Sequence, residues 1–320
     1  MNAIVYDRYG LPEVLRLGEV EKPVPGDDEI LVRVCAVSVN RSDWEGLIGK
    51  PLYSRMSGLR KPRKPILGSD VAGRVEAVGQ NQTQFKPGDE VFGEMEDYHG
   101  GFAEYICTRP DAWTLKPAEL TFEQASAIPQ AGVIALQGLN RNGELRPGQR
   151  VLINGAGGGA GSFAIQLAKS YGAEVTGVDN AGKLEFMRSL GADQVIDYAK
   201  EDFTKSGESY DLILDLIAQR SAFACARALR KGGSYFAVGG PVRVLLQILF
   251  LRRLIRLTTG RNVNILAVHR NRTDLDRIAD LCVTGRIVPY IDIHYSLDQV
   301  PEALQYLGDG LAKGKIVISL

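Results

Sequence analysis

The sequence has few residues of the kinds that cross-link small secreted domains or hold structural metal ions. Its 320 residues include only four cysteines and three histidines, and no two cysteines stand in a Cys-x-x-Cys pair. This spacing is unlike a disulfide framework or a four-cysteine zinc lobe, so neither is expected. The cysteines are expected to be small buried apolar residues in a reduced, cytoplasmic protein.

The chain also lacks an excess of charge and a long apolar run. Lys plus Arg and Asp plus Glu both number 38, so no global charge attracts nucleic acid or an anionic membrane. Residues 1–7 are typical of a strand, so no cleavable leader is expected. The apolar segment 244–257 contains Arg252, Arg253 and Arg256 and is too short to span a bilayer. A helix over the substrate pocket or at a subunit contact is favoured there over a membrane-surface helix.

Glycine, by contrast, is abundant, and it is concentrated in one turn. The apolar strand 151–154 leads into this turn, a helix is expected over 162–170, and the strand 174–178 ends at Asp179. A strand, glycine turn, helix and second strand with an acidic residue about twenty positions on form the dinucleotide fingerprint. The backbone approaches a pyrophosphate there, and the helix N-terminus stabilises its charge. The residues expected to bind the cofactor are Gly155, Ala156, Gly157, Gly158, Gly159, Ala160 and Gly161.

The pattern of expected strands and helices changes near residue 121. Before it, short strands separated by turns indicate a barrel or sandwich. After it, strands alternate with helices, which predicts a doubly wound parallel sheet. The strands are expected at 150–154, 174–178, 194–196, 212–216, 234–238 and 263–268, and the helices at 162–170, 183–190 and 220–229. The residues after about 270, with a capping box at 296–299, are expected to return to the first domain.

Several motifs, in this order, resemble the medium-chain dehydrogenase/reductase superfamily, in its zinc-free quinone oxidoreductase and alkenal/enone reductase branch. They are 39–43, 67–73, 86–91, 100–105, the glycine turn, 190–193 and 314–317. The resemblance implies an α/β protein with a GroES-like β-barrel catalytic domain and a Rossmann domain. The expected boundaries are 1–122 for the first part of the catalytic domain, 123–270 for the Rossmann domain and 271–320 for the return.

The resemblance also implies that no zinc ion takes part. The zinc alcohol dehydrogenases of this superfamily use a Cys where this chain has Asn40, and a His-Glu pair where it has Ser69 and Asp70. Amide and hydroxyl groups are poor zinc ligands beside thiolate and imidazole. An acceptor that is electrophilic without a metal is therefore expected, namely a quinone or an α,β-unsaturated carbonyl compound.

Two signals conflict over the nicotinamide cofactor. Asp179 stands where an acidic side chain accepts a hydrogen bond from the ribose 2′-hydroxyl and repels a 2′-phosphate, which favours NAD(H). Lys183 and Tyr198 match positions that contact the 2′-phosphate in the quinone oxidoreductase family, and they tip the prediction to NADP(H). The alternatives for them are a solvated lysine and a packed loop aromatic. Val238, Gly239 and Gly240 end a strand at the expected nicotinamide edge.

The candidate catalytic residues are Tyr53, Asn40, Asp43 and Gln130. Tyr53 is the expected donor because a Tyr occupies this region in related enoyl reductases, although a loop tyrosine without a catalytic role is the alternative. Asn40 and Asp43 match positions that line the cleft, and Asp43 is equally compatible with a hydrogen-bond anchor. Gln130 is placed near the nicotinamide, where it would contact the substrate or the carboxamide.

Two further functions compete with the reductase: a zinc-independent alcohol/aldehyde dehydrogenase, and a non-enzymatic protein that senses nucleotides or binds RNA. The basic run 60–64 gives slight support to RNA, but such runs are usually solvated surface, and no nucleic-acid partner is expected. The apolar strand 263–268 could form a sheet edge that pairs in a homodimer.

Overall fold

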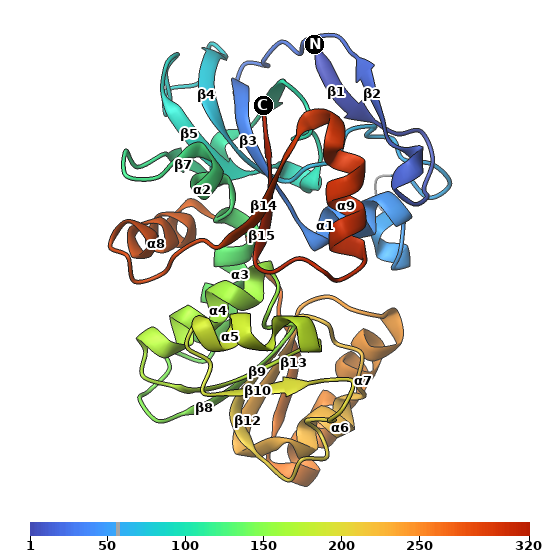
Figure 1. The fold of residues 1–320 in the computed structure, drawn as a ribbon, viewed down its shortest axis with the longest axis vertical. Helices are drawn as coiled ribbons and strands as arrows, with labels where there is room; N and C mark the ends of the chain where they lie inside the picture. The colour runs from blue at the N-terminus through green and yellow to red at the C-terminus, as the bar shows by residue number, and fades with distance from the viewer. Residues whose placement is uncertain (56–57) are drawn as a thin grey trace. The chain divides into compact units, whose positions relative to one another are not determined.

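The computed structural model describes residues 1–55 and 58–320, and its contacts divide these residues into two compact units. Unit 1 comprises Met1–Val133, Arg270–Gly285 and Pro289–Leu320, and unit 2 comprises Ile134–His269 and Arg286–Val288 (Figure 1). The first division therefore falls later than the residue 122 expected from the sequence. The reason is that the helix directly after residue 121 packs on strands of unit 1.

Unit 1 is built on a seven-stranded sheet in the order β14-β15-β3-β4-β5-β7, with β6 also paired to β3. Neighbouring strands are antiparallel except β14 and β15, which are parallel. The strands are β3 (Ile30–Val39), β4 (Asp70–Val78), β5 (Glu90–Glu94), β6 (Tyr105–Thr108), β7 (Trp113–Leu115), β14 (Ile291–Ser296) and β15 (Lys315–Ser319), beside the hairpin β1 (Asn2–Val5) and β2 (Arg16–Glu19). The last strand of the chain thus lies inside the sheet, between the edge strand β14 and β3.

The helices of unit 1 close one core around this sheet. They are α1 (Arg41–Ile48), α2 (Phe122–Ser126), α8 (Arg272–Val283) and α9 (Val300–Gly308), with the short turns η1 (Pro12–Val14), η2 (Leu52–Arg55), η3 (Glu96–Tyr98), η4 (Pro110–Ala112) and η6 (Leu297–Gln299). Trp44 of α1, Leu304 of α9 and Ile316 of β15 belong to one buried cluster. The predicted capping box is confirmed, because Ser296 and Gln299 cap η6 reciprocally. Helix α3 (Pro129–Asn140) runs from unit 1 into unit 2.

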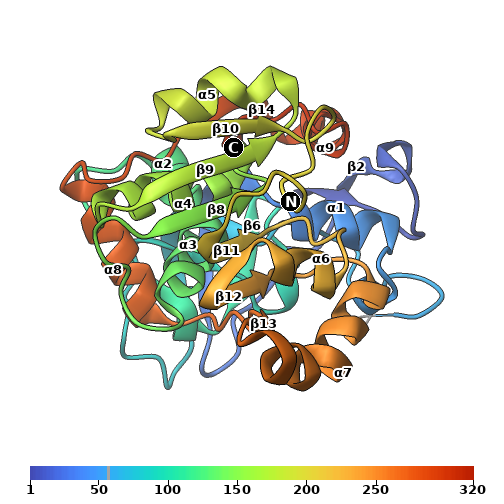
Figure 2. The ribbon, with the colours of Figure 1, turned by 90° about the horizontal axis from the view of Figure 1, so that it is seen from below.

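Unit 2 contains the predicted parallel sheet, in the order β10-β9-β8-β11-β12-β13 (Figure 2). All of its strand pairs are parallel. The strands are β8 (Arg150–Asn154), β9 (Glu174–Asp179), β10 (Gln194–Asp197), β11 (Tyr210–Asp215), β12 (Leu229–Ala237) and β13 (Asn262–Ile265), and the helices are α4 (Gly159–Ser170), η5 (Ala181–Lys183), α5 (Leu184–Ser189), α6 (Ala222–Arg227) and α7 (Val242–Thr259). The order reverses at β8 and β11, so a ligand crevice is expected where these strands end.

The apolar segment near residue 250 forms α7, which packs on β13 and α6. In the described part of the chain, no helix combines the length and the apolarity needed to cross a bilayer.

Candidate functional site

The glycine turn of unit 2 lies where β8 ends and α4 begins. A Cβ added to Gly161 would lie 2.3 Å from the carbonyl oxygen of Gly155 and 2.5 Å from Cα of Ala156. Gly155 itself has a φ of +85°. Backbone atoms cannot move aside as a flexible side chain can, so the close packing of helix on strand requires glycine at these two positions.

Gly158 is different, because the fold does not require it. Its φ is −91°, and a Cβ there would lie 3.5 Å from its nearest neighbour, the carbonyl oxygen of Gly155. It is the N-cap of α4, and no side chain of the described residues caps this helix end. A bare, uncapped N-terminus with room above it fits the pyrophosphate of a dinucleotide, which takes hydrogen bonds from free backbone N–H groups.

Asp179 and Lys183 close over this turn. One carboxylate oxygen of Asp179 accepts from the backbone N–H of Gly157 at 3.0 Å, and the other lies 3.7 Å from Nζ of Lys183. Both side chains are largely buried. The solvated lysine considered from the sequence is therefore not what the structure has. Lys183 therefore offsets the negative charge of Asp179.

Tyr198 lies beside this pair through its backbone, whose N–H donates to the carbonyl oxygen of Asp179 at 3.1 Å. Its side chain is 53% exposed, so it is not a packed loop aromatic. The structure thus brings Asp179, Lys183 and Tyr198 together where β9 and β10 end. These are the positions from which side chains reach the adenosine ribose in this fold.

The strand end at which the nicotinamide was predicted to bind is fixed by the carboxylate of Asp215, which the sequence did not reveal as part of the site. Val238 donates its backbone N–H to the carbonyl of Asp215, and Gly239 and Gly240 follow with positive φ. The buried carboxylate of Asp215 accepts from Asn154 Nδ2 at 2.7 Å, from the hydroxyl of Tyr235 at 2.9 Å, and from the backbone N–H groups of residues 217 and 218. It therefore ties together the ends of β8, β11 and β12, at the crevice edge of the sheet.

In unit 1, the start of α1 carries two of the candidate catalytic residues. Asn40 is the N-cap, and its backbone N–H donates to Asp43 at 2.7 Å. The other oxygen of Asp43 accepts from the backbone N–H of Gly68 at 3.1 Å. Asp43 is fully buried, and burial raises its pKa to about 7. The geometry is that of the hydrogen-bond anchor considered from the sequence, because one oxygen caps the start of α1 and the other joins α1 to the turn before β4.

The three positions that would hold zinc in metal-dependent members form a hydrogen-bonded group around a lysine. Asn40 Nδ2 donates to Oγ of Ser69 at 3.0 Å, and Asn40 Oδ1 accepts from Nζ of Lys315 at 2.5 Å. The same Nζ lies 3.6 Å from Oδ2 of Asp70. Burial lowers the pKa of Lys315 and raises that of Asp70 against their mutual attraction. An internal ammonium thus provides the cation here, and both Asn40 and Ser69 already have partners.

Gln130 connects this group to a buried glutamate. Its backbone N–H donates to Asp70 at 3.1 Å, its Nε2 donates to Glu94 at 3.0 Å, and its Oε1 accepts from Ser42 at 3.2 Å. Burial, and then the charge of Asp70, raise the pKa of Glu94 to about 8. Gln130 therefore positions two carboxyl groups, and Glu94 can carry a proton at neutral pH.

These raised pKa values predict how the stability of unit 1 depends on pH. Glu94, ordinarily 4.5, and Asp43, ordinarily 3.8, hold protons in the folded protein that the unfolded chain has released. The free energy of unfolding is expected to fall as pH rises from about 5 to about 8, by about 1.4 kcal/mol per pH unit for each proton retained. Glu94→Gln should make this slope shallower by the contribution of one retained proton, about 1.4 kcal/mol per pH unit.

The measurement is urea unfolding of both proteins across this pH range. Glu119→Gln, at an exposed site outside the group, is the matched control and should leave the slope as it is. Equal slopes for the Glu94→Gln variant and the unaltered protein would contradict a protonated Glu94.

Over residues 1–55 and 58–320, no group of three or more His, Cys, Asp or Glu side chains is placed to hold a metal ion. Tyr53, the predicted donor, lies in η2 and is 36% exposed. Its role stays a prediction.

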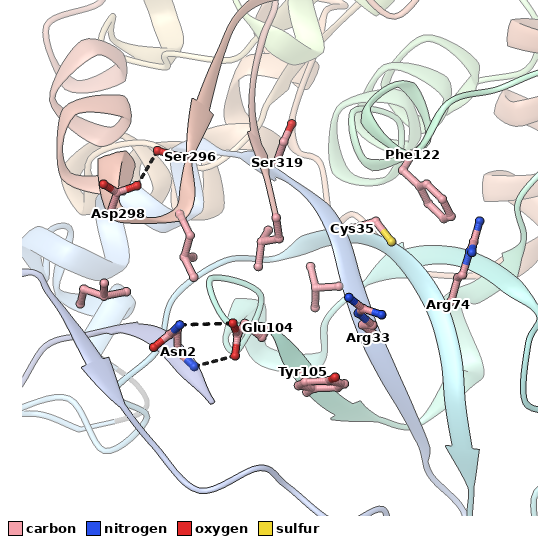
Figure 3. A pocket seen from close by; sticks show the side chains of 14 residues that line it. Asn2, Arg33, Cys35, Arg74, Glu104, Tyr105, Phe122, Ser296, Asp298 and Ser319 are labelled. Atoms are coloured by element: carbon pink, nitrogen blue, oxygen red, sulfur yellow. Dashed lines mark hydrogen bonds between the residues drawn. The ribbon is translucent and has the colours of Figure 1, made fainter.

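A cavity of about 720 Å³ lies elsewhere in unit 1, between β3, β4 and the 296–298 turn. Figure 3 shows that Arg33 and Cys35, both on β3, line one side of the cavity, with Arg74 close to Phe122. Asn2 and Glu104, which are hydrogen-bonded to one another, line another side. None of the predicted site residues lines this cavity, and burial raises the pKa of Cys35, so its thiol stays protonated.

The sequence reasoning missed Lys315, Glu94 and Asp215 as parts of the site. A weak signal existed for Lys315, because it directly precedes the apolar run 316–318 in the last strand. A lysine that is buried in such a strand needs a polar or charged partner.

Two family models match the chain. The model described as "Alcohol dehydrogenase GroES-like domain" matches residues 26–118, and the one described as "Zinc-binding dehydrogenase" matches residues 190–318.

Individual proteins resemble the whole chain. A 2-methylene-furan-3-one reductase from Solanum lycopersicum is 32% identical over 99% of this chain and 79% of its own length. An NADPH-dependent alkenal/one oxidoreductase, chloroplastic, from Arabidopsis thaliana is 31% identical over 99% of this chain and 79% of its own. The solved quinone oxidoreductase from Coxiella burnetii is 29% identical, with a TM-score of 0.89 over 100% of this chain and 99% of that one.

Proposed function

The chain belongs to the quinone and enone oxidoreductases of the medium-chain dehydrogenase/reductase superfamily, and we propose that it reduces a quinone or an α,β-unsaturated carbonyl compound with NADPH. The observation that carries the proposal is the group formed by Asn40, Ser69 and Lys315. At the positions where metal-dependent members bind zinc, this chain has an amide and a hydroxyl that bind each other and an internal ammonium. Such a site suits an acceptor that needs no Lewis acid.

NADPH supplies a hydride when bound, and the chain supplies position and charge. In unit 2, the bare N-terminus of α4 binds the pyrophosphate, and Lys183 offers positive charge near the 2′-phosphate. Incoming charge on the acceptor delocalises to its oxygen, which needs a hydrogen-bond donor. Tyr53 is the proposed donor, because its side chain is partly exposed whereas Asn40 and Ser69 are buried and Asn40 already donates to Ser69. Asp43 and Gln130 are proposed to position the α1 and α3 segments of the site rather than to react.

The test is oxidation of NADPH by the purified protein with a panel of quinones, enones, enals and simple alcohols. We expect turnover with quinones or unsaturated carbonyl compounds and the same rate after treatment with a chelator. No turnover across that panel would contradict the proposal, and so would loss of activity on chelation. Oxidation of simple alcohols without added metal would favour the alcohol dehydrogenase alternative instead.

Cofactor preference should respond in opposite directions to two substitutions. Lys183→Gln removes the positive charge and leaves Asp179 unneutralised, so kcat/KM for NADPH should fall about tenfold or more relative to NADH. Asp179→Ser removes the repulsion and should raise the same ratio. Lys200→Gln, at an exposed lysine near the end of β10, is the control and should change the ratio little. Equal effects on both cofactors in the Lys183→Gln variant would contradict a 2′-phosphate contact.

A homodimer is proposed as well, because β13 is an edge strand of the unit 2 sheet and could pair across a two-fold axis. A cytoplasmic location remains a proposal, supported by the scattered cysteines.

A further inference from the structure

In a long segment that runs from unit 2 into the start of α8, the charged residues are all positive. Between residues 216 and 273 the sequence has eleven Lys and Arg residues and no Asp or Glu. Arg220 and Arg230 are neutralised by acids from earlier in the chain, at 2.8 and 2.9 Å. The arginines of α7 are exposed and have no acidic partner among the described residues: Arg243, Arg252, Arg253 and Arg256. A chain with zero net charge thus has a strongly basic local surface.

The same helix exposes large apolar side chains. The inner face of α7, formed by Val244, Ile248 and Ile255, is buried on the sheet. The opposite side, which we call the outer face of α7, is formed by Leu246, Leu249, Phe250, Leu254 and Leu257. Phe250 is 74% exposed and Leu257 is 85% exposed. In the view of Figure 2, α7 lies at the periphery of the sheet, beyond β13. Exposed apolar residues that gather on one face of a helix mark an interaction surface.

We propose that the outer face of α7 docks on the surface of an anionic lipid membrane. Leucine and phenylalanine side chains enter the boundary between headgroups and acyl chains, which suits a helix lying in the plane of the interface. The arginines that alternate with them can extend along the helix and place their guanidinium groups among lipid phosphates. The apolar side chains thus match the lipid acyl chains, and the unpaired arginines match the negative charge of the headgroups.

A second copy of the chain fits this face less well. Pairing of α7 with α7 across a two-fold axis would bring the arginines of one helix against those of the other, and no acid within residues 216–273 could compensate. RNA fits the charge but not the apolar strip, because phosphate contacts leave Leu246, Leu249 and Leu257 exposed to water.

The experiment is flotation of the full chain with phosphatidylcholine vesicles prepared with and without phosphatidylglycerol. Docking is expected on the anionic vesicles only, and it should weaken as salt is added. Phe250→Glu/Leu257→Glu and Arg252→Gln/Arg253→Gln should each reduce the partition coefficient about tenfold or more. The matched controls carry equivalent double changes at exposed sites of unit 1, Val24→Glu/Leu59→Glu and Arg8→Gln/Arg63→Gln, and should bind as the unaltered protein does.

Sedimentation velocity and an RNA gel shift on the same proteins separate the other occupants. Absence of binding to anionic vesicles overturns the proposal, as does binding that both α7 variants retain. Loss of a dimer in the Phe250→Glu/Leu257→Glu variant without any vesicle binding assigns the face to a second copy. Salt-dependent RNA retention without vesicle binding assigns it to nucleic acid. Because no step uses the reductase reaction, an inactive protein that docks would refute the proposed function and leave this proposal intact.

Discussion

Lys315→Met is expected to cost the protein about 3–5 kcal/mol of stability, because it leaves the buried carboxylate of Asp70 without its cation. Nζ of Lys315 lies 3.6 Å from Asp70, which is fully buried. Burial, and then the negative charge of Asp70, raise the pKa of the neighbouring Glu94. Methionine keeps the apolar stem of the lysine, so packing changes little and the effect is that of the charge. Urea unfolding near neutral pH measures it, and hydrogen exchange should place the loss in unit 1.

A second substitution distinguishes charge from packing. Asp70→Asn in the Lys315→Met background removes the uncompensated charge and keeps an acceptor for the backbone N–H of Gln130. The double variant should regain about 2 kcal/mol or more over Lys315→Met and should be recovered even if the single variant does not fold. Lys313→Met, on the same segment but outside the group, is the control. A single variant as stable as the unaltered protein would refute the role of the ammonium.

Gly158→Ser is expected to weaken NADPH binding about tenfold or more, which is about 1.4 kcal/mol, without loss of folding stability. The structure leaves room for a side chain there, with the nearest atom 3.5 Å from the added Cβ, and serine is a good N-cap. Its hydroxymethyl group, however, would lie where the pyrophosphate approaches α4. Titration of NADPH by intrinsic fluorescence and thermal unfolding without cofactor measure the two quantities separately.

Two companion variants sharpen this result. Gly158→Ala should weaken binding to a similar extent with a modest loss of stability, because alanine is a poor N-cap. Gly161→Ala should damage both, since its Cβ would lie 2.3 Å from a backbone oxygen. Unchanged NADPH affinity in both Gly158 variants would show that the dinucleotide does not bind at this helix end.

The sequence predicted the parts of the site that are local. The glycine turn, Asp179 and Lys183 lie within thirty residues of one another, and a strand, a turn and a helix place them without reference to the rest of the chain. The capping box at Ser296 was predictable for the same reason.

The group around Lys315 could not be predicted in this way. It joins β4, the start of α1 and the last strand, and these meet only because β15 pairs with β3. The hydrogen bond between Lys315 and Asn40 follows from that pairing, and the bond from Gln130 to Glu94 joins α3 to β5. Catalytic roles were therefore predicted for Asn40 and Gln130, whose side chains the structure shows hydrogen-bonded to other residues of this group. The basic segment 50–65, which is longer than usual for the family and hard to align with it, includes Tyr53, and its residues 56 and 57 lie outside the described residues.

The position of β15 has a consequence for how the protein is made. The ribosome synthesises this strand after the other strands of the two described sheets, yet it lies between β14 and β3. Until it emerges, two neighbouring strands have unsatisfied edges, and the acidic interior lacks its compensating amine. All six strands of the parallel sheet precede it, so that unit can close while the nascent chain is still attached. Unit 1 is therefore expected to complete its folding after unit 2.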